Sequence, residues 1–194
     1  MRLSTLLLIC LFLFACTRLT AKTAWRLRIQ DGHIAALSLA LLVLGAFPLS
    51  LSESVTVNPA SAALLLYALC LCRGVPDILE ALLTGLLAGL IGWCLCSLIH
   101  FYEMGVLLAL PAAILPALLQ SRKRTALLAA ACAPLFYGLF RMLEDWYLFD
   151  WRVLEFGGGI QLDAEIAALF LLALLWYLPL GRRRGARRIP HPAG

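Results

Sequence analysis

Carboxylates gather in one stretch of the chain, between residues 141 and 165. They are Glu144, Asp145, Asp150, Glu155, Asp163 and Glu165. Carboxylate oxygens are hard ligands that bind cations, and acids inside a membrane segment commonly mark the path of an ion or a substrate. One hypothesis is therefore an outward-facing site for a cation or a cationic ligand. Asp163 and Glu165 are its deepest candidates, because a long apolar run follows them.

The same stretch also fits a structural interpretation. Its aromatic residues are typical of a belt at a membrane–water interface; they include Trp146, Tyr147 and Trp151. Arg141 stands at helical spacing from Glu144 and Asp145, so ion pairs along one helix face would neutralise these charges. Asp163 and Glu165 would meet the positive end of a helix dipole. Both interpretations stay open at this point.

Composition decides the class of protein. Of the 194 residues, 63% are hydrophobic and 14% are charged, and the mean hydropathy is +0.93. Soluble domains have about 45–50% apolar and about 25% charged residues. A soluble fold of this size could not bury so much apolar surface, which excludes a soluble enzyme and a disordered chain. We expect a polytopic membrane protein, with no cofactor or metal indicated by any motif.

Seven apolar stretches predict an all-α integral membrane protein, with about seven transmembrane helices in one bundle. They are Leu3–Thr17, Ile34–Leu51, Pro59–Cys72, Ile78–Ile99, Met104–Leu119, Ala126–Leu143 and Ile160–Leu180. A crossing helix needs about 17–25 residues, so the first and third stretches need their polar flanks. The runs are continuous, which does not fit the alternating pattern of a β-barrel. Residues 1–181 form the membrane domain, and residues 182–194 form a basic tail.

Basic residues predict the orientation, because Lys and Arg in short loops stay on the cytoplasmic side. Most of the 16 basic residues lie in alternate connections and in the tail, namely 18–28, Arg73, 122–124 and 182–188. Most acids lie in the other connections. The N-terminus is therefore expected outside, and the C-terminus in the cytoplasm. The tail arginines would touch anionic lipid, and since they account for topology, no nucleic-acid partner is expected.

The N-terminus allows a second interpretation. Leu13-Phe14-Ala15-Cys16 after an apolar run resembles a bacterial lipoprotein signal, in which Cys16 would be lipidated after cleavage. Phe14 is bulky where such signals have a small residue. Cleavage would also leave the basic segment 18–28 outside, against the charge rule. An uncleaved first helix is the expectation.

Two helix starts are marked by capping residues. Asn58 followed by Pro59 suits an N-cap with proline at the first helical position. Asp77 is expected to cap the helix of residues 78–99, with Glu80 three residues later completing a capping box.

Small residues recur along the fourth apolar stretch. Gly85, Ala88, Gly89 and Gly92 form small-xxx-small patterns, which let helix backbones approach closely in lipid. We expect this helix to be the central packing element of the bundle. Homodimerisation through the same face is the alternative.

The seven cysteines include two Cys-x-Cys pairs, at positions 70 and 72 and at positions 94 and 96. Residues two apart on a helix point about 200° apart around its axis, so neither pair offers both sulfurs to one metal ion. These cysteines are expected to be packing residues.

The chain resembles two known families, one in short segments of sequence and the other in topology alone. Val75-Pro76-Asp77-Ile78-Leu79, followed by an apolar helix and a later glycine-rich acidic segment, resembles the prepilin peptidases. This resemblance implies an intramembrane aspartyl hydrolase, with Asp77 and Asp163 as its acid and base. The sequence departs from the family at both catalytic positions. Residues 70–72 stand where the first aspartate is expected, and three residues separate Gly159 from Asp163.

Seven spans with an outside N-terminus also resemble the outline of the SWEET sugar transporters, which implies three helices, a linker helix and three more. The equivalent first and fifth spans share no motif, because only the fifth holds prolines, Pro111 and Pro116.

The role expected first is non-enzymatic. The protein would be a component of a bacterial cytoplasmic membrane that packs with partner helices or with a second copy. A small-solute or ion transporter that uses the acids of residues 144–165 is the second hypothesis. An intramembrane hydrolase is the third.

Overall fold

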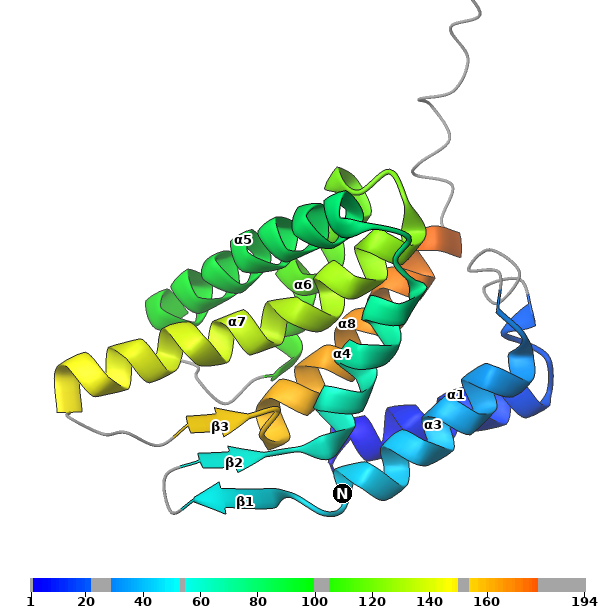
Figure 1. The fold of residues 1–194 in the computed structure, drawn as a ribbon, viewed down its shortest axis with the longest axis horizontal. Coiled ribbons are helices and arrows are strands. Elements are labelled where there is room, and N and C mark those ends of the chain that lie inside the picture. Colours follow the sequence, from blue (N-terminus) through cyan, green and yellow to red (C-terminus); the bar gives the residue numbers. More distant parts are fainter. Residues whose placement is uncertain (1, 22–28, 53–54, 100–104, 150–153, 178–194) are drawn as a thin grey trace, which may run out of the picture.

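The structure is a computed structural model that describes residues 2–21, 29–52, 55–99, 105–149 and 154–177 (Figure 1). Within these residues the chain forms seven helices and three short strands. The helices are α1 (Leu3–Cys16), α3 (Asp31–Gly45), α4 (Pro59–Leu71), α5 (Val75–Ile99), α6 (Gly105–Leu119), α7 (Lys123–Phe149) and α8 (Gly159–Tyr177). The strands are β1 (Leu49–Ser52), β2 (Val55–Val57) and β3 (Leu154–Phe156).

The prediction of a mostly helical chain is confirmed, and each predicted apolar stretch overlaps one described helix. The expectation of a purely helical fold is wrong in one region. The stretch 34–51 was expected to be one helix, but α3 ends at Gly45 and Leu49 begins a strand. Short β pairings satisfy the backbone groups between the helices there.

Helix length separates the seven described helices into two groups. Three of them, α5, α7 and α8, are long and apolar enough to cross a membrane. With 27 residues, α7 is about 40 Å long, which exceeds the hydrocarbon thickness of about 30 Å. The others have 13 to 15 residues and are about 20–23 Å long. Length alone therefore supports three crossings.

Alanine is the commonest residue of the described core, which also holds several leucines, while most of the other large apolar residues lie at the surface. Five helices each bury an alanine completely or nearly so: Ala60, Ala88, Ala112, Ala130 and Ala168. Leucines of the same helices face outward, and Leu98 is 79% exposed. In water the hydrophobic effect drives leucine inward. Lipid supplies no such force, and helices associate there through small residues that permit close contact. The excess of alanine inside and of leucine outside is compatible with helices that lie in a membrane.

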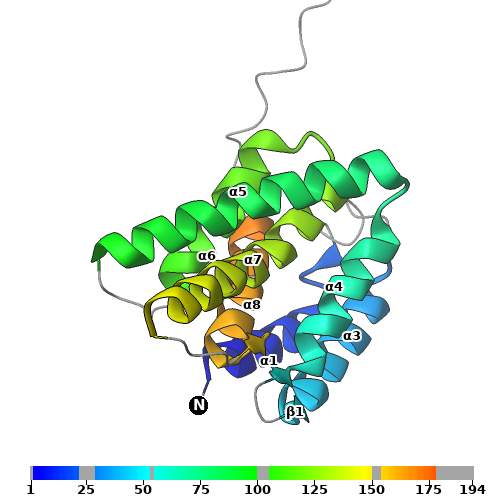
Figure 2. The same ribbon diagram turned by 60° about the vertical axis from the view of Figure 1, so that its left-hand side comes forward.

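The closest helix pair is α5 with α7, and Figure 2 shows α5 lying across α6 and α7. A Cβ atom added to Gly89 would stand 2.7 Å from the carbonyl oxygen of Ala133 and 2.8 Å from Cβ of Phe136. One added to Gly85 would stand 3.0 Å from the carbonyl oxygen of Ala129. On the α6 side, a Cβ on Gly92 would come within 2.6 Å of Leu108. These glycines therefore serve contacts within one molecule.

A three-stranded sheet joins two of the loops that lead into helices. β1 and β2 form an antiparallel hairpin, and β3 pairs in parallel with β2, with Val55 opposite Leu154 and Val57 opposite Phe156. Directly after these strands the chain enters α4 and α8. The two helices therefore start side by side (Figure 1).

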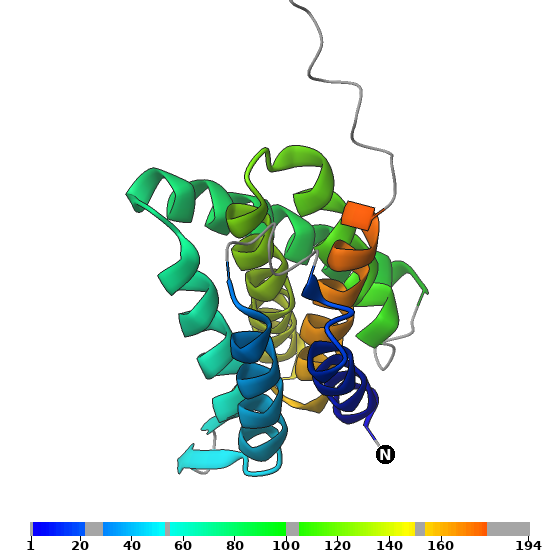
Figure 3. The same ribbon diagram turned by 90° about the vertical axis from the view of Figure 1, so that its right-hand side faces the viewer.

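The first two helices form a hairpin that packs on the side of the bundle. α1 and α3 contact each other, while α1 also contacts α8 and α3 also contacts α4 (Figure 3). α1 ends at Cys16, and Arg18 then adopts a left-handed conformation with φ of 59°. The amide of Leu19 bonds the carbonyl of Phe14 at 2.9 Å there, which closes the helix end.

One of the two predicted helix caps is confirmed. The Asn58 side chain accepts a hydrogen bond from the amide of Ala60 at 2.9 Å, with Pro59 at the first helical position. The capping box of Asp77 and Glu80 is wrong. α5 begins three residues earlier than expected, so Asp77 lies inside its first turn. Its carboxylate forms an ion pair with Arg122 instead.

We expect Gly89→Ala to lower the free energy of unfolding by about 1–3 kcal/mol, because its methyl group would press on the α7 backbone. Thermal unfolding of the purified protein in detergent measures this. The matched control is Gly32→Ala, because a Cβ there would meet nothing within 4 Å. Equal stability of the two variants would contradict the close contact.

Candidate functional site

A buried carboxylate lies where α4, α7 and α8 meet. Glu165, on α8, is 1% exposed. The Ser61 hydroxyl of α4 donates a hydrogen bond to its Oε1 at 2.5 Å, and α7 packs against both α4 and α8. The other carboxylate oxygen, Oε2, is buried and has no hydrogen-bond partner among the described residues. A buried oxygen of this kind costs free energy unless it is protonated or bound.

The small sheet explains why Ser61 and Glu165 meet although they are 104 residues apart. The amide of Asn58 donates to the carbonyl of Phe156 at 2.8 Å, which extends the β2–β3 pairing to the first residue before α4. Gly157 follows with φ of +69°, a conformation that favours glycine. A Cβ at this position would also collide with Ser61. The turn therefore brings the first turns of α4 and α8 into contact.

Asp163 caps a helix other than its own. Its Oδ1 accepts a hydrogen bond from the amide of Ser4 at 2.8 Å, in the first turn of α1. The Arg2 side chain reaches the same place, since a Cβ on Gly159 would lie 3.4 Å from its Cζ. A carboxylate near the start of a helix satisfies exposed amides and meets the positive end of the dipole. The Asp163 side chain thus links the start of α1 to the N-terminal part of α8 by a hydrogen bond.

Gln161 completes this polar region. Its Oε1 accepts a hydrogen bond from the amide of Gly157 at 2.7 Å, which stabilises the turn before α8. The same side chain lies against Gly138 of α7, where an added Cβ would collide with it. We call the set Ser4, Asn58, Ser61, Gln161, Asp163 and Glu165 the junction cluster. Of these residues, sequence reasoning proposed only Asp163 and Glu165 as site candidates.

The remaining acids do not join the junction cluster. Glu144, on α7, accepts a hydrogen bond from the Trp93 indole of α5 at 2.8 Å. Asp145 lies 3.9 Å from the Arg141 guanidinium, one helical turn earlier. Asp150 lies outside the described residues. In the described part of the chain, no group of three or more His, Cys, Asp or Glu side chains could hold a metal ion.

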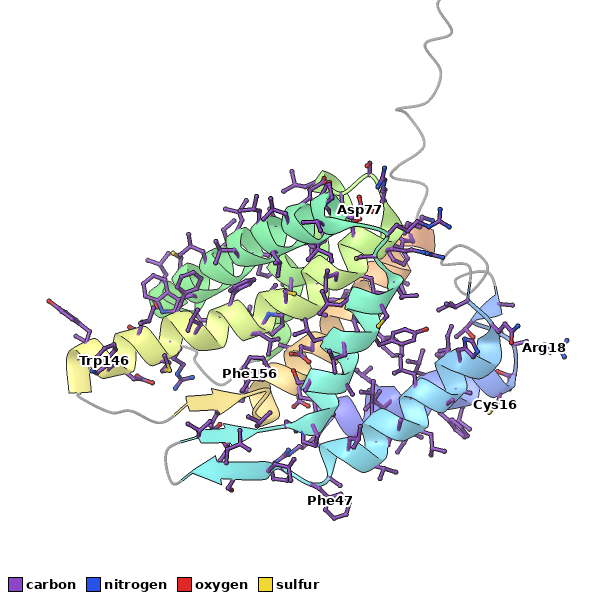
Figure 4. All side chains as sticks on the ribbon, viewed as in Figure 1. Cys16, Arg18, Phe47, Asp77, Trp146 and Phe156 are labelled. Carbon is purple, nitrogen blue, oxygen red and sulfur yellow. The ribbon has the colours of Figure 1, made fainter. Side chains whose placement is uncertain are left out.

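The two aspartates expected for hydrolysis are not brought together. Asp77 lies in the first turn of α5, beside the α6–α7 connection (Figure 4). Asp163 lies in the second turn of α8, beside the start of α1. These places are at opposite ends of the fold. An acid and a base must reach the same substrate atom, so this arrangement provides no aspartyl pair.

A second polar region occupies the end of the fold that holds Asp77. Besides its ion pair with Arg122, this end includes Arg124, which donates to the carbonyl of Leu71 at 3.3 Å. Nζ of Lys123 lies 5.4 Å from the centre of the Trp176 ring, within cation–π range. Gln120 donates to the Thr84 hydroxyl at 2.6 Å. Charged and polar groups therefore hold the helix ends together here too.

Comparison with known proteins gives no match: no family model, no curated protein and no solved structure is significantly similar to this chain.

We expect Ser61→Ala to lower the free energy of unfolding by about 1–3 kcal/mol, because it leaves the Glu165 carboxyl with no donor. The matched control is Ser38→Ala. Ser38 is equally buried, but its hydroxyl bonds only Ala35 of its own helix, at 2.9 Å.

The same substitution is expected to cost much less when Glu165 is already leucine, because no carboxyl is then left unpaired. Thermal unfolding of the four variants of this cycle measures the coupling. Additive effects, or an equal loss for Ser38→Ala and Ser61→Ala, would contradict the pairing.

Proposed function

We propose that this protein is a non-enzymatic, seven-span component of a bacterial cytoplasmic membrane, which packs with other membrane proteins or with a second copy. One observation carries the proposal: polar side chains of the described core join helices or cap them. Asp163 fastens α1 to α8, and Glu165 binds α4. Glu144 binds α5, and Gln120 joins the α6–α7 turn to α5. Because these hydrogen bonds hold helices together, they support a structural role for the polar side chains rather than a catalytic one.

The distribution of basic and acidic residues between the two ends of the fold supports the proposed orientation in the membrane. At one end of the fold lie Arg18, Arg73 and Arg122, with Asp77 paired to the last of them. At the other end lie Glu155 and Asp163. Figure 4 follows the same axis, with Arg18 and Asp77 toward one end and Trp146 and Phe156 toward the other. The positive-inside rule places the basic end in the cytoplasm and the sheet outside.

The lengths of the helices are compatible with seven crossings if the bilayer adapts. A helix shorter than the hydrocarbon thickness is accommodated by local thinning and by flanking residues, and a longer one by tilt. α7 carries Trp146 and Tyr147 near its end, where aromatic residues anchor to the interface. The short helices α1 and α4 both begin at the sheet end, where the junction cluster gives their first turns polar partners.

An outward apolar surface supports the packing role. α5 exposes Leu79, Leu83, Leu87 and Leu90 along one side, while its glycines contact α6 and α7. Partner helices and lipid tails are both suited to such a surface. A variant at Gly89 cannot test partner binding, because that residue holds α5 to α7 within the molecule.

Transport is the second candidate, and a single observation favours it. Glu165 is a buried acid whose Oε2 has no partner in the described part of the chain, and acids inside membrane segments often carry protons or bind ions. Proton uptake by proteoliposomes that is lost in Glu165→Gln, with the protein still folded, would replace the non-enzymatic proposal with this one.

Reporter fusions in a bacterial host test the proposed topology. We expect green fluorescent protein to fluoresce when fused after Gly74 or Ser121, because these turns lie at the basic end. Alkaline phosphatase is expected to be active only when fused after Ser52, at the sheet end. Phosphatase activity after Ser121 would invert the orientation. Activity after both Ser52 and Gly74 would show that α4 does not cross.

A further inference from the structure

An apolar cavity of about 380 Å³ lies between the α1–α3 hairpin and helices α4, α7 and α8. Ligand pockets generally measure about 300–1,000 Å³. Its walls are leucine, isoleucine and phenylalanine side chains, with buried Leu8, Leu41 and Leu64 at its inner end. Leu19 and Leu174 also line it and are 67% and 57% exposed, so the cavity opens at that side.

The position of the cavity along the helices places its mouth at the basic end. Its lining comes from the later residues of α1 and α8, including Phe14 and Trp176, and from the first half of α3, including Ile34. α4 contributes Leu64 from its middle and Tyr67 from its second half. Each of these segments lies toward the end of the fold that holds Arg122 and Asp77.

A buried hydroxyl stands near the mouth. Tyr67 lines the cavity, and its hydroxyl is buried without a hydrogen-bond partner among the described residues. Arg124 lies close by, because it donates a hydrogen bond to the carbonyl of Leu71, one helical turn beyond Tyr67. A buried hydroxyl normally finds a partner. A polar headgroup or ester oxygen entering from the mouth would supply one.

A basic pocket adjoins this mouth. It also measures about 380 Å³, and it is lined by Leu71, Arg73, Asp77, Arg122, Lys123, Arg124 and Thr125. Leu71 follows Tyr67 by one helical turn on α4, and Lys123 precedes Leu127 of the cavity wall by one turn on α7. Lys123 also lies over Trp176, which lines the cavity. The two spaces are therefore neighbours, one apolar and one cationic.

We propose that the two spaces together bind one anionic glycerophospholipid, with an acyl chain in the apolar cavity and the phosphate at Lys123 and Arg124. The charge of the pocket selects this occupant: four of its seven lining residues are basic and one is acidic. Arg and Lys are the usual partners of phosphate. A partner helix or an uncharged lipid would fill the apolar cavity but would bring no phosphate to the basic side chains of the adjoining pocket. The inference rests on the proposed membrane location, with the basic end toward anionic lipid.

Native mass spectrometry of the full-length protein, incubated with lipid in detergent, tests the assignment. The probes are phosphatidylglycerol and phosphatidylcholine with the same acyl chains. We expect phosphatidylglycerol to be retained at least fivefold more, and Lys123→Gln or Arg124→Gln each to lower its retention about fivefold. Arg141→Gln, at the other end of α7, is the matched control and should leave retention unchanged.

A second variant tests the acyl-chain position independently of charge. Ala173 lines the cavity, so Ala173→Phe is expected to reduce the retention of phosphatidylglycerol, while Ala46→Phe at an exposed position outside the cavity is not. Thermal unfolding confirms that each variant is folded. Inorganic phosphate at millimolar concentration should not displace the lipid. Displacement by it would assign the site to free phosphate and overturn the proposal.

Equal retention of the two lipids would also overturn the proposal, and so would unchanged retention in both Lys123→Gln and Ala173→Phe. These failures are distinguishable from failure of the proposed function, because the reporter fusions would still map the same topology.

Discussion

Close contact between helix backbones is the constraint on which the rest of this structure depends. In lipid the hydrophobic effect does not drive helices together, so stability must come from van der Waals contact and from hydrogen bonds between helices. The chain meets this requirement with glycine where α5 crosses α7 and with fully buried alanine on five helices. Many leucines are consequently left for the outer surface, which is the kind of surface that suits acyl chains.

Hydrogen bonds then decide which helices become neighbours. The parallel pairing of β2 with β3 sets α4 beside α8, and Glu165 bonds Ser61 across that contact. Asp163 holds the start of α1 in the same place. At the opposite end α1 and α3 diverge from α4 and α8, and the apolar cavity occupies the space between them. The same arrangement of helices therefore accounts for both features. The helices meet at the sheet end, where the junction cluster lies, and separate at the basic end, where the cavity opens.

The helices could be predicted from the sequence, because each apolar run is local and is bounded by charges or turn residues. Asn58 could be assigned as a cap for the same reason, since Pro59 follows it. The sheet could not. Its strands have three or four residues, and its parallel pair joins segments that no local pattern connects. Asp163 was expected to interact with the dipole of its own helix, but its partner amide is 159 residues away.

Other parts of the candidate site depended equally on distant contacts. The acids of residues 144–165 look like one group in the sequence, yet Glu144 faces α5 and Glu165 faces α4. Ser61 is a single hydroxyl in an apolar run, and nothing in its neighbours indicates a carboxylate partner. The cavity is lined by residues of five helices, and its outline emerges only when they are assembled. Local chemistry therefore predicted elements and caps, while long-range pairing determined the site.

The accessibility of the outer face of α5 tests the central claim most directly. Spin labels would be placed singly at Leu83, Leu87 and Leu90, in reconstituted protein whose seven cysteines have been replaced. If these leucines face acyl chains, the labels will collide often with dissolved oxygen and rarely with a water-soluble nickel chelate. Frequent collisions with the chelate at all three positions would show that this face meets water, and the account of small residues inside and leucine in lipid would be wrong.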